Sequence, residues 1–255
     1  MTGAPAAAAQ PVLEVRGVTK LYGGLRAVAD VTFSVAPGEV LGIAGPNGAG
    51  KTTLFDTITG HTVATSGEIR LAGTPIQDAK IHQRCRLGLA RTFQHPAAAD
   101  TLSVLENAYL AASFRRGKTG RSRDNDIAAG RAALELVGLQ DQVDTPAALL
   151  RVYDKKRLMI ATALATNPEV LLLDEPFGGL NLREIDDTLA LIRLIRDMGM
   201  AVVCIEHVMR ALMALADRVL VMHHGAELFV GTPQQMVRDK QVIEVYLGST
   251  GKEPG

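Results

Sequence analysis

Three short apolar runs predict the buried strands of a parallel sheet. They are Val40–Ala44, Val170–Asp174 and Ala201–Ile205, and helical patterns follow them at 52–58, 183–198 and 208–216. Apolar strands that alternate with helices form a mostly parallel sheet with helices on both faces. We therefore expect an α/β fold whose ligand lies at the carboxyl ends of these strands.

Segments with alternating apolar and polar residues predict a second, antiparallel sheet. They lie at 12–19, 31–35 and 68–71, and such half-polar strands suit a sheet with one solvated face. Another short strand is expected to end at 91–94. A hairpin through His224 and Gly225 is predicted to place His223 and His224 on opposite faces, which disfavours a metal site there.

The region from 102 to 166 changes to helical patterns. We predict helices at 103–112, 127–137 and 155–165. The polar stretch 115–126 between the first two is interpreted as a solvated connection, with a basic patch facing a membrane as the alternative.

A glycine-rich loop follows the first apolar run and precedes the first predicted helix. Its sequence fits the phosphate-binding pattern G-x-x-x-x-G-K-[ST], and its residues are Gly45, Pro46, Asn47, Gly48, Ala49, Gly50, Lys51, Thr52 and Thr53. The glycines let backbone N–H groups face phosphates, and the helix N-terminus adds positive potential. Lys51 is expected to reach the β- and γ-phosphates, and Thr52 to bind Mg²⁺. The loop predicts a nucleoside triphosphate site.

Carboxylates at a second strand end add catalytic chemistry. Asp174 closes an apolar run and is placed to hold Mg²⁺, while the next residue, Glu175, can orient and polarise an attacking water. His207 follows another strand and could hydrogen-bond a γ-phosphate, although a strand-end histidine is more often structural. Gln94, taken alone, indicates no functional role.

Composition narrows the class of protein. The chain has 255 residues, 47% hydrophobic residues and no net formal charge, which fits a soluble globular protein and gives no argument for nucleic-acid binding. Its two cysteines, Cys85 and Cys204, are too far apart in sequence to suggest a disulfide framework or a metal site, which favours a reducing compartment. We find no signal peptide and no apolar run of the roughly 18 residues that span a bilayer, so we expect a cytoplasmic protein.

Together these motifs resemble the ATP-binding subunits of ATP-binding cassette (ABC) transporters. The resemblance implies a single ABC ATPase domain at 12–248, with an antiparallel β subdomain, a helical subdomain at about 95–166, and tails at 1–11 and 249–255. ATP and Mg²⁺ are the implied ligands. The resemblance assigns catalysis to Glu175, His207 and Gln94, metal binding to Thr52, Gln94 and Asp174, and nucleotide contacts beyond the loop to Tyr22, stacked on adenine, and Val28.

The sequence is most similar to one subfamily, the larger ATPase subunit of branched-chain amino acid importers. This similarity is carried by 22–28, 91–95, 174–181 and the tail motifs at 231–233 and 245–248. Urea and other amide importers share much of this pattern, and lipopolysaccharide exporters share less. The implied partners are two transmembrane permease subunits, with a periplasmic substrate-binding protein acting indirectly, at the cytoplasmic face of the inner membrane.

One segment departs from the family. Where a Leu-Ser-Gly-Gly-Gln signature is expected, this chain has Leu150, Arg151, Val152, Tyr153 and Asp154. In the family the signature contacts the ATP held by the opposite subunit, so we expect unequal nucleotide sites and a heterodimer with a second ATPase subunit. The alternatives are a regulatory nucleotide-binding module without turnover and a soluble ABC ATPase.

Overall fold

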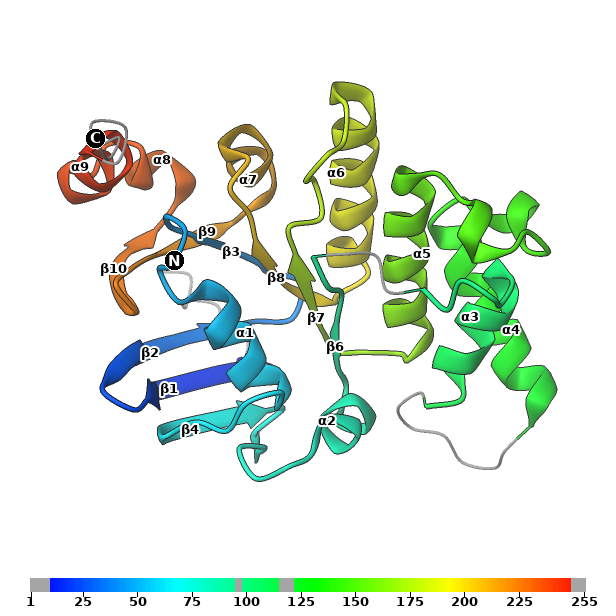
Figure 1. Cartoon of the computed structure of the whole chain (residues 1–255), viewed down its shortest axis with the longest axis horizontal. Coiled ribbons are helices and arrows are strands. Elements are labelled where there is room, and N and C mark those ends of the chain that lie inside the picture. Colours follow the sequence, from blue (N-terminus) through cyan, green and yellow to red (C-terminus); the bar gives the residue numbers. More distant parts are fainter. Residues whose placement is uncertain (1–9, 95–97, 115–121, 249–255) are drawn as a thin grey trace, which may run out of the picture.

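A computed structural model describes residues 10–94, 98–114 and 122–248, and in it two sheets pack around a shared core (Figure 1). The larger sheet has the order β10-β9-β3-β8-β7-β6 and is parallel except for β10. Its strands are β3 (Val40–Ala44), β6 (Leu89–Arg91), β7 (Val170–Asp174), β8 (Ala201–Ile205), β9 (Arg218–His223) and β10 (Ala226–Gly231). The predicted parallel sheet is confirmed.

The smaller sheet is antiparallel and has the order β2-β1-β4-β5. Its strands are β1 (Leu13–Tyr22), β2 (Leu25–Val35), β4 (Ser66–Leu71) and β5 (Thr74–Pro75). β2 begins six residues before the predicted strand at 31–35. The prediction missed this first half because most of its side chains are exposed or half-buried and show no apolar alternation. The predicted second sheet is nevertheless confirmed.

Nine α-helices and two 3₁₀ turns complete the described residues. The helices are α1 (Lys51–Thr59), α2 (Ile81–Leu87), α3 (Val104–Ala112), α4 (Arg123–Leu136), α5 (Val152–Ala165), α6 (Leu182–Asp197), α7 (Met209–Leu215), α8 (Pro233–Met236) and α9 (Lys240–Gly248), and the 3₁₀ turns are Gln140–Gln142 and Ala147–Leu149. In Figure 1, α3, α4 and α5 pack together beside the β6 edge of the larger sheet. None of the described helices is long and apolar enough to cross a membrane.

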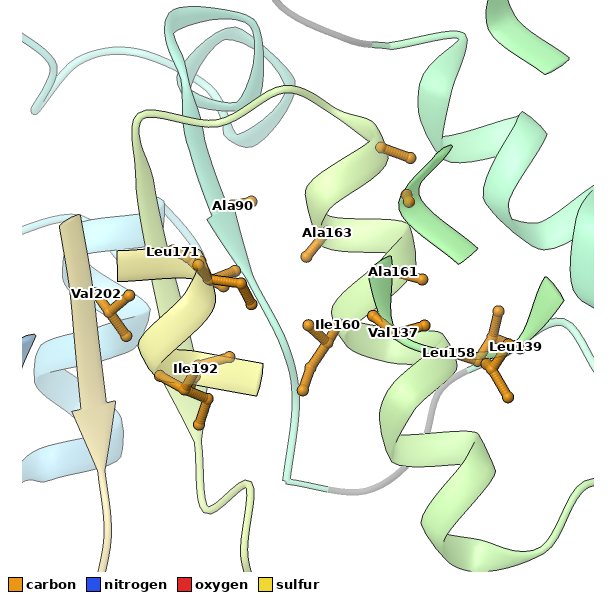
Figure 2. Close-up of a cluster of buried hydrophobic side chains, with 14 of the residues drawn as sticks. Ala90, Val137, Leu139, Leu158, Ile160, Ala161, Ala163, Leu171, Ile192 and Val202 are labelled. Carbon is orange, nitrogen blue, oxygen red and sulfur yellow. The ribbon is translucent and has the colours of Figure 1, made fainter. Parts of the chain in front are cut away.

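Helix α5 lies between the sheet and the other two helices of this group. Ile160 and Ala163 face β6 and β7, whereas Leu158 packs beside Val137 and Leu139 at the end of α4 (Figure 2). Since two faces of α5 are buried, its hydrophobic periodicity is weak. The sequence pattern therefore places the start of the helix at residue 155, whereas the helix begins at Val152.

Several expectations need correction. β6 ends at Arg91, so Gln94 lies three residues beyond the strand that was predicted to end there. α4 begins at Arg123, inside the stretch interpreted as a connection, and α2, α8 and α9 had not been predicted. Residues 1–9 of the tail expected at 1–11, the tail expected at 249–255 and the stretch 115–121 lie outside the described residues.

Candidate active site

The phosphate loop runs from the end of β3 to the first turn of α1, and its backbone requires glycine at two points. Gly45 has a φ of 142°, and an added Cβ would overlap the carbonyl oxygen of Met222. Gly50 has a φ of 97°, and its Cβ would overlap the carbonyl oxygen of Ala27. No side chain among the described residues caps the N-terminus of α1, so the first-turn N–H groups remain available to an anion.

The Lys51 side chain folds back over the loop that precedes it. Its Nζ donates hydrogen bonds to the carbonyl oxygens of Gly45, at 2.7 Å, and Pro46, at 3.0 Å. Burial lowers the pKa of Lys51, while the negative charges of Glu175 and Asp174 oppose that shift. The lysine is therefore a partly desolvated cation that is stabilised by the negative charges of two carboxylates.

An open pocket of about 560 Å³ lies over the loop. Its lining brings together most of the residues that the sequence singled out, namely Tyr22, Asn47, Gly48, Ala49, Gly50, Lys51, Thr52, Thr53, Gln94 and Glu175. The sequence did not indicate the other lining residues, which are Leu25, Arg26, Ala27, His224 and Gly225. Val28 is fully buried in the core, and the neighbouring Ala27 lines the pocket in its place. Tyr22 is half-exposed at the rim, where an adenine could stack on it.

Asp174 is buried at the end of β7 and is paired with a cation that the sequence analysis missed. Arg91, at the end of β6, donates to Asp174 Oδ2 at 2.8 Å and to Asp56 Oδ1 at 2.6 Å. Burial raises the pKa of Asp174, and the contact with Arg91 opposes this shift. Because β6 and β7 are neighbouring parallel strands in register, their carboxyl ends bring the two charges together.

Glu175 stands at the centre of a small polar cluster. Gln94 Nε2 donates to Glu175 Oε2 at 2.7 Å, and His207 Nδ1 lies 3.6 Å from Glu175 Oε1. Glu175 has a φ of 50°, in the left-handed region that a side chain seldom adopts. The pocket therefore holds the Glu175 carboxylate and the Gln94 amide opposite the phosphate loop, while His207 lies beside Glu175 and outside the pocket lining.

Two further charged residues support this cluster and were not assigned a role from the sequence. Glu206 is fully buried and accepts hydrogen bonds from the backbone N–H groups of Phe177, His207 and Val208. Lys156 on α5 donates to the carbonyl oxygen of Glu175 at 3.0 Å. An acidic residue directly after the apolar strand β8 was the one sequence feature that could have drawn attention to Glu206.

Residues 150–154 form the entry to α5. Arg151 and Val152 are exposed at the first turn, whereas the Tyr153 ring lies under the Arg157 guanidinium, 5.1 Å from it, and Asp154 Oδ1 lies 3.4 Å from Arg157 Nη1. The side chains of Tyr153 and Asp154 thus contact α5 itself. Arg151 and Val152 form the exposed end of the helix.

The hairpin histidines correct one expectation. The rings of His223 and His224 do not separate to opposite faces, because their centroids lie 3.9 Å apart. His224 has a φ of 48°, and side chains alternate only along extended backbone. Among the described residues, no group of three or more histidines, cysteines and carboxylates could hold a metal ion.

Comparisons with known proteins agree with this geometry. A family model described as ABC transporter matches residues 28–178, which is more than half of the chain. The chain is 39% identical over 251 residues to the high-affinity branched-chain amino acid transport ATP-binding protein BraF of Pseudomonas aeruginosa, covering 94% of this chain and 98% of BraF. It is 38% identical over 252 residues to the similarly named LivG of Escherichia coli, with the same coverage.

More distant matches point the same way. The lipopolysaccharide export system ATP-binding protein LptB of Escherichia coli is 32% identical over 236 residues, covering 92% of this chain and 97% of LptB. A crystal structure of MJ1267 in its ADP conformation, an ATP-binding cassette of an ABC transporter, superposes with a TM-score of 0.85 at 26% identity, covering 94% of this chain and 99% of MJ1267. With its phosphate loop, strand-end carboxylates and near full-length relatives, the chain belongs to the ATP-binding subunits of ABC transporters and is an ABC transporter ATPase.

Proposed function

We propose that this chain hydrolyses ATP to energise an ABC importer for branched-chain amino acids. The observation that carries the catalytic part is the position of Glu175, which lines the same pocket as the phosphate loop and is held there by Gln94. The cargo is inferred from BraF and LivG, two branched-chain amino acid transport ATP-binding proteins that match nearly the whole chain.

The loop residues bind and orient the nucleotide. Backbone N–H groups of 45–53 cradle the phosphates, Lys51 neutralises the β- and γ-phosphates, and Tyr22 stacks on the base. The chain also offers hydroxyl, amide and carboxylate oxygens on Thr52, Gln94 and Asp174, the donor types that Mg²⁺ prefers. Bound Mg²⁺ supplies charge neutralisation for the phosphate oxygens.

Glu175 is the residue proposed to act on water. Its carboxylate accepts the proton of the attacking water, and the hydrogen bond from Gln94 fixes its orientation. His207, beside the same carboxylate, donates to the γ-phosphate as negative charge develops. The pocket opening leaves room for this water opposite the phosphate loop.

We further propose that this subunit pairs with a second ATPase subunit and two transmembrane permease subunits at the cytoplasmic face of the membrane. In the proposed dimer, residues 150–154 face the nucleotide of the partner. Arg151 and Val152 form the exposed end of this segment and lack the hydroxyl and glycine of the family signature. The nucleotide site of the partner, which this segment closes, is therefore expected to hydrolyse ATP weakly. The nucleotide site on this chain needs an intact signature from the partner.

The test is ATP turnover and leucine uptake by the complete transporter with Glu175→Gln. Loss of the catalytic carboxylate is expected to lower turnover by roughly 10²- to 10⁴-fold while nucleotide binding persists. Glu135→Gln, an exposed amide substitution on α4, serves as the matched control. Unchanged turnover in Glu175→Gln would place hydrolysis in the partner and leave this chain as a regulatory nucleotide-binding module. Turnover without leucine uptake would reassign the cargo, with an amide importer or a lipopolysaccharide exporter as the next candidates.

A further inference from the structure

Helix α5 contacts the backbone of the catalytic residue Glu175 through the side chain of Lys156. Lys156 lies two residues after Asp154, and its Nζ donates to the Glu175 carbonyl oxygen at 3.0 Å. Burial lowers the pKa of Lys156, and the charges of Glu206 and Glu175 oppose that shift. The ammonium therefore contacts the backbone of Glu175 and feels the negative charge of the buried Glu206 carboxylate without a direct hydrogen bond to it.

Glu206 organises the backbone of the two loops that follow β7 and β8. It accepts from the N–H groups of Phe177 at 3.0 Å and of His207 and Val208 at 2.8 Å each, and it has no solvent exposure. Phe177 follows the catalytic strand β7, whereas His207 follows β8. One carboxylate thus joins the two loops that carry Glu175 and His207.

The backbone of Glu175 is held in a conformation that needs such support. Its φ of 50° is unfavourable for a residue with a side chain. Its N–H donates to Ile205 at 3.0 Å, and its carbonyl oxygen accepts from Lys156 and, at 3.3 Å, from the N–H of Gly178. Of these contacts, only the one with Lys156 comes from the helical region.

We propose that Lys156 and Glu206 are positioning residues that tie the start of α5 to the backbone of Glu175 and His207. The inference rests on the proposed hydrolysis at Glu175. Residues 150–154 lead into α5 and form its first turn, so a displacement of α5 moves the Lys156 ammonium that holds the Glu175 backbone. The backbone of 175–177 passes this displacement to Glu206, which binds the N–H groups of both Phe177 and His207. The nucleotide faced by the start of α5 is thereby coupled to the catalytic groups of this chain's own pocket.

The matched pair of variants lies at adjacent positions on α5. Lys155 is paired at the surface with Asp100, at 3.4 Å, and among the described residues its side chain makes no hydrogen bond or ion pair with the catalytic loops. In the complete transporter, Lys156→Gln is expected to lower kcat about tenfold with KM for ATP within about twofold, because a charge-assisted hydrogen bond to the catalytic backbone is lost. Lys155→Gln is expected to leave both constants near those of the unaltered complex. Lys156→Arg, which keeps the charge, is expected to recover most of kcat.

The second half of the link is tested with Glu206→Gln. This change replaces one acceptor oxygen with an amide donor, so kcat is expected to fall by about tenfold with little change in KM. If both residues act through one link, the double variant is expected to lose less than the product of the two separate losses. Thermal unfolding of each variant separates this effect from a general loss of folded protein.

Amide hydrogen exchange of the full chain provides a readout that does not depend on turnover. Peptides covering 175–178 and 206–208 are expected to exchange faster in Lys156→Gln and Glu206→Gln than in Lys155→Gln. Equal exchange and equal kcat in Lys156→Gln and Lys155→Gln would overturn the positioning role. The proposed function is refuted by a different result: full ATP turnover in Glu175→Gln, or no turnover in the unaltered complex. Even then, the hydrogen-exchange comparison of Lys156→Gln with Lys155→Gln decides the positioning role.

Discussion

Replacing Arg91 by methionine removes a buried cation while keeping a side chain of similar length. The Arg91 side chain is 6% exposed and lies 2.8 Å from Asp174, which is 5% exposed. It also lies 2.6 Å from Asp56, which is 35% exposed. Arg91→Met therefore leaves one buried carboxylate and one partly solvated carboxylate without this partner.

The magnitude is set by the buried pair. Removing one partner of a buried ion pair typically costs about 3–5 kcal/mol, because the remaining charge is uncompensated. The contact with Asp56 adds at most about 1 kcal/mol, because solvent screens it. Stacking of the guanidinium on Phe55 and Phe93 adds about 0.5–1 kcal/mol for each ring. The buried pair dominates, and for a chain of this size such a loss lowers Tm by roughly 6–20 °C.

Urea unfolding followed by far-UV circular dichroism measures this loss, since the chain has no tryptophan. Asp56→Asn is the matched control and is expected to cost about 1 kcal/mol or less. The double variant Arg91→Met/Asp174→Asn is expected to be more stable than Arg91→Met, because it leaves no buried unpaired charge.

The pH dependence gives a second check. Burial raises the folded pKa of Asp174 above its unfolded value, and removing Arg91 raises it further. A carboxyl with a raised folded pKa destabilises the fold above that pKa, and protonation removes the penalty as pH falls through it. The difference in unfolding free energy between Arg91→Met and the unaltered chain should therefore shrink as pH falls from neutral. A loss below about 1 kcal/mol at neutral pH, or a double variant no more stable than Arg91→Met, would refute this reasoning.

Three other outcomes are expected. Gly50→Ala should abolish nucleotide binding and lower Tm, because the added Cβ overlaps a backbone carbonyl oxygen of β2. Gly23→Ala is the control: no described atom lies within 4 Å of its added Cβ, so urea unfolding should show a loss of only about 1 kcal/mol. Iodoacetamide should modify Cys85 slowly at pH 8, because burial raises its thiol pKa and lowers the thiolate fraction, and should reach fully buried Cys204 only after unfolding, as mass spectrometry can show. Tyr22→Ala should weaken binding of a fluorescent ATP analogue by about 1–3 kcal/mol, while unchanged affinity would exclude stacking.

The main strands could be predicted because of how they are buried. Every residue of β3, β7 and β8 is buried, so each strand appears in the sequence as an apolar run. Since β7 and β8 pair in parallel register with Asp174 opposite Ile205, the polar residues that follow them meet at one edge. Strand ends and loop glycines are local features, and this part of the candidate site was therefore visible in the sequence.

The supporting contacts could not be predicted because they join distant segments. Arg91 meets Asp56 and Asp174, which are 35 and 83 residues away, and no local pattern encodes such a meeting. Lys156 likewise reaches Glu175 across 19 residues from a helix buried on two faces. The left-handed backbone of Glu175 was equally hidden, because glutamate has no preference for it.

The exposed start of α5 has an evolutionary consequence. Arg151 and Val152 lie outside the core, so their replacement changes stability little, typically within about 0.5 kcal/mol. Leu158 and Ile160, further along the same helix, are held by packing on two sides. Neutral drift can therefore rewrite the tip of α5 while the body of the helix stays fixed. After gene duplication, the two ATPase subunits can therefore diverge first at this exposed start of α5 while both remain folded.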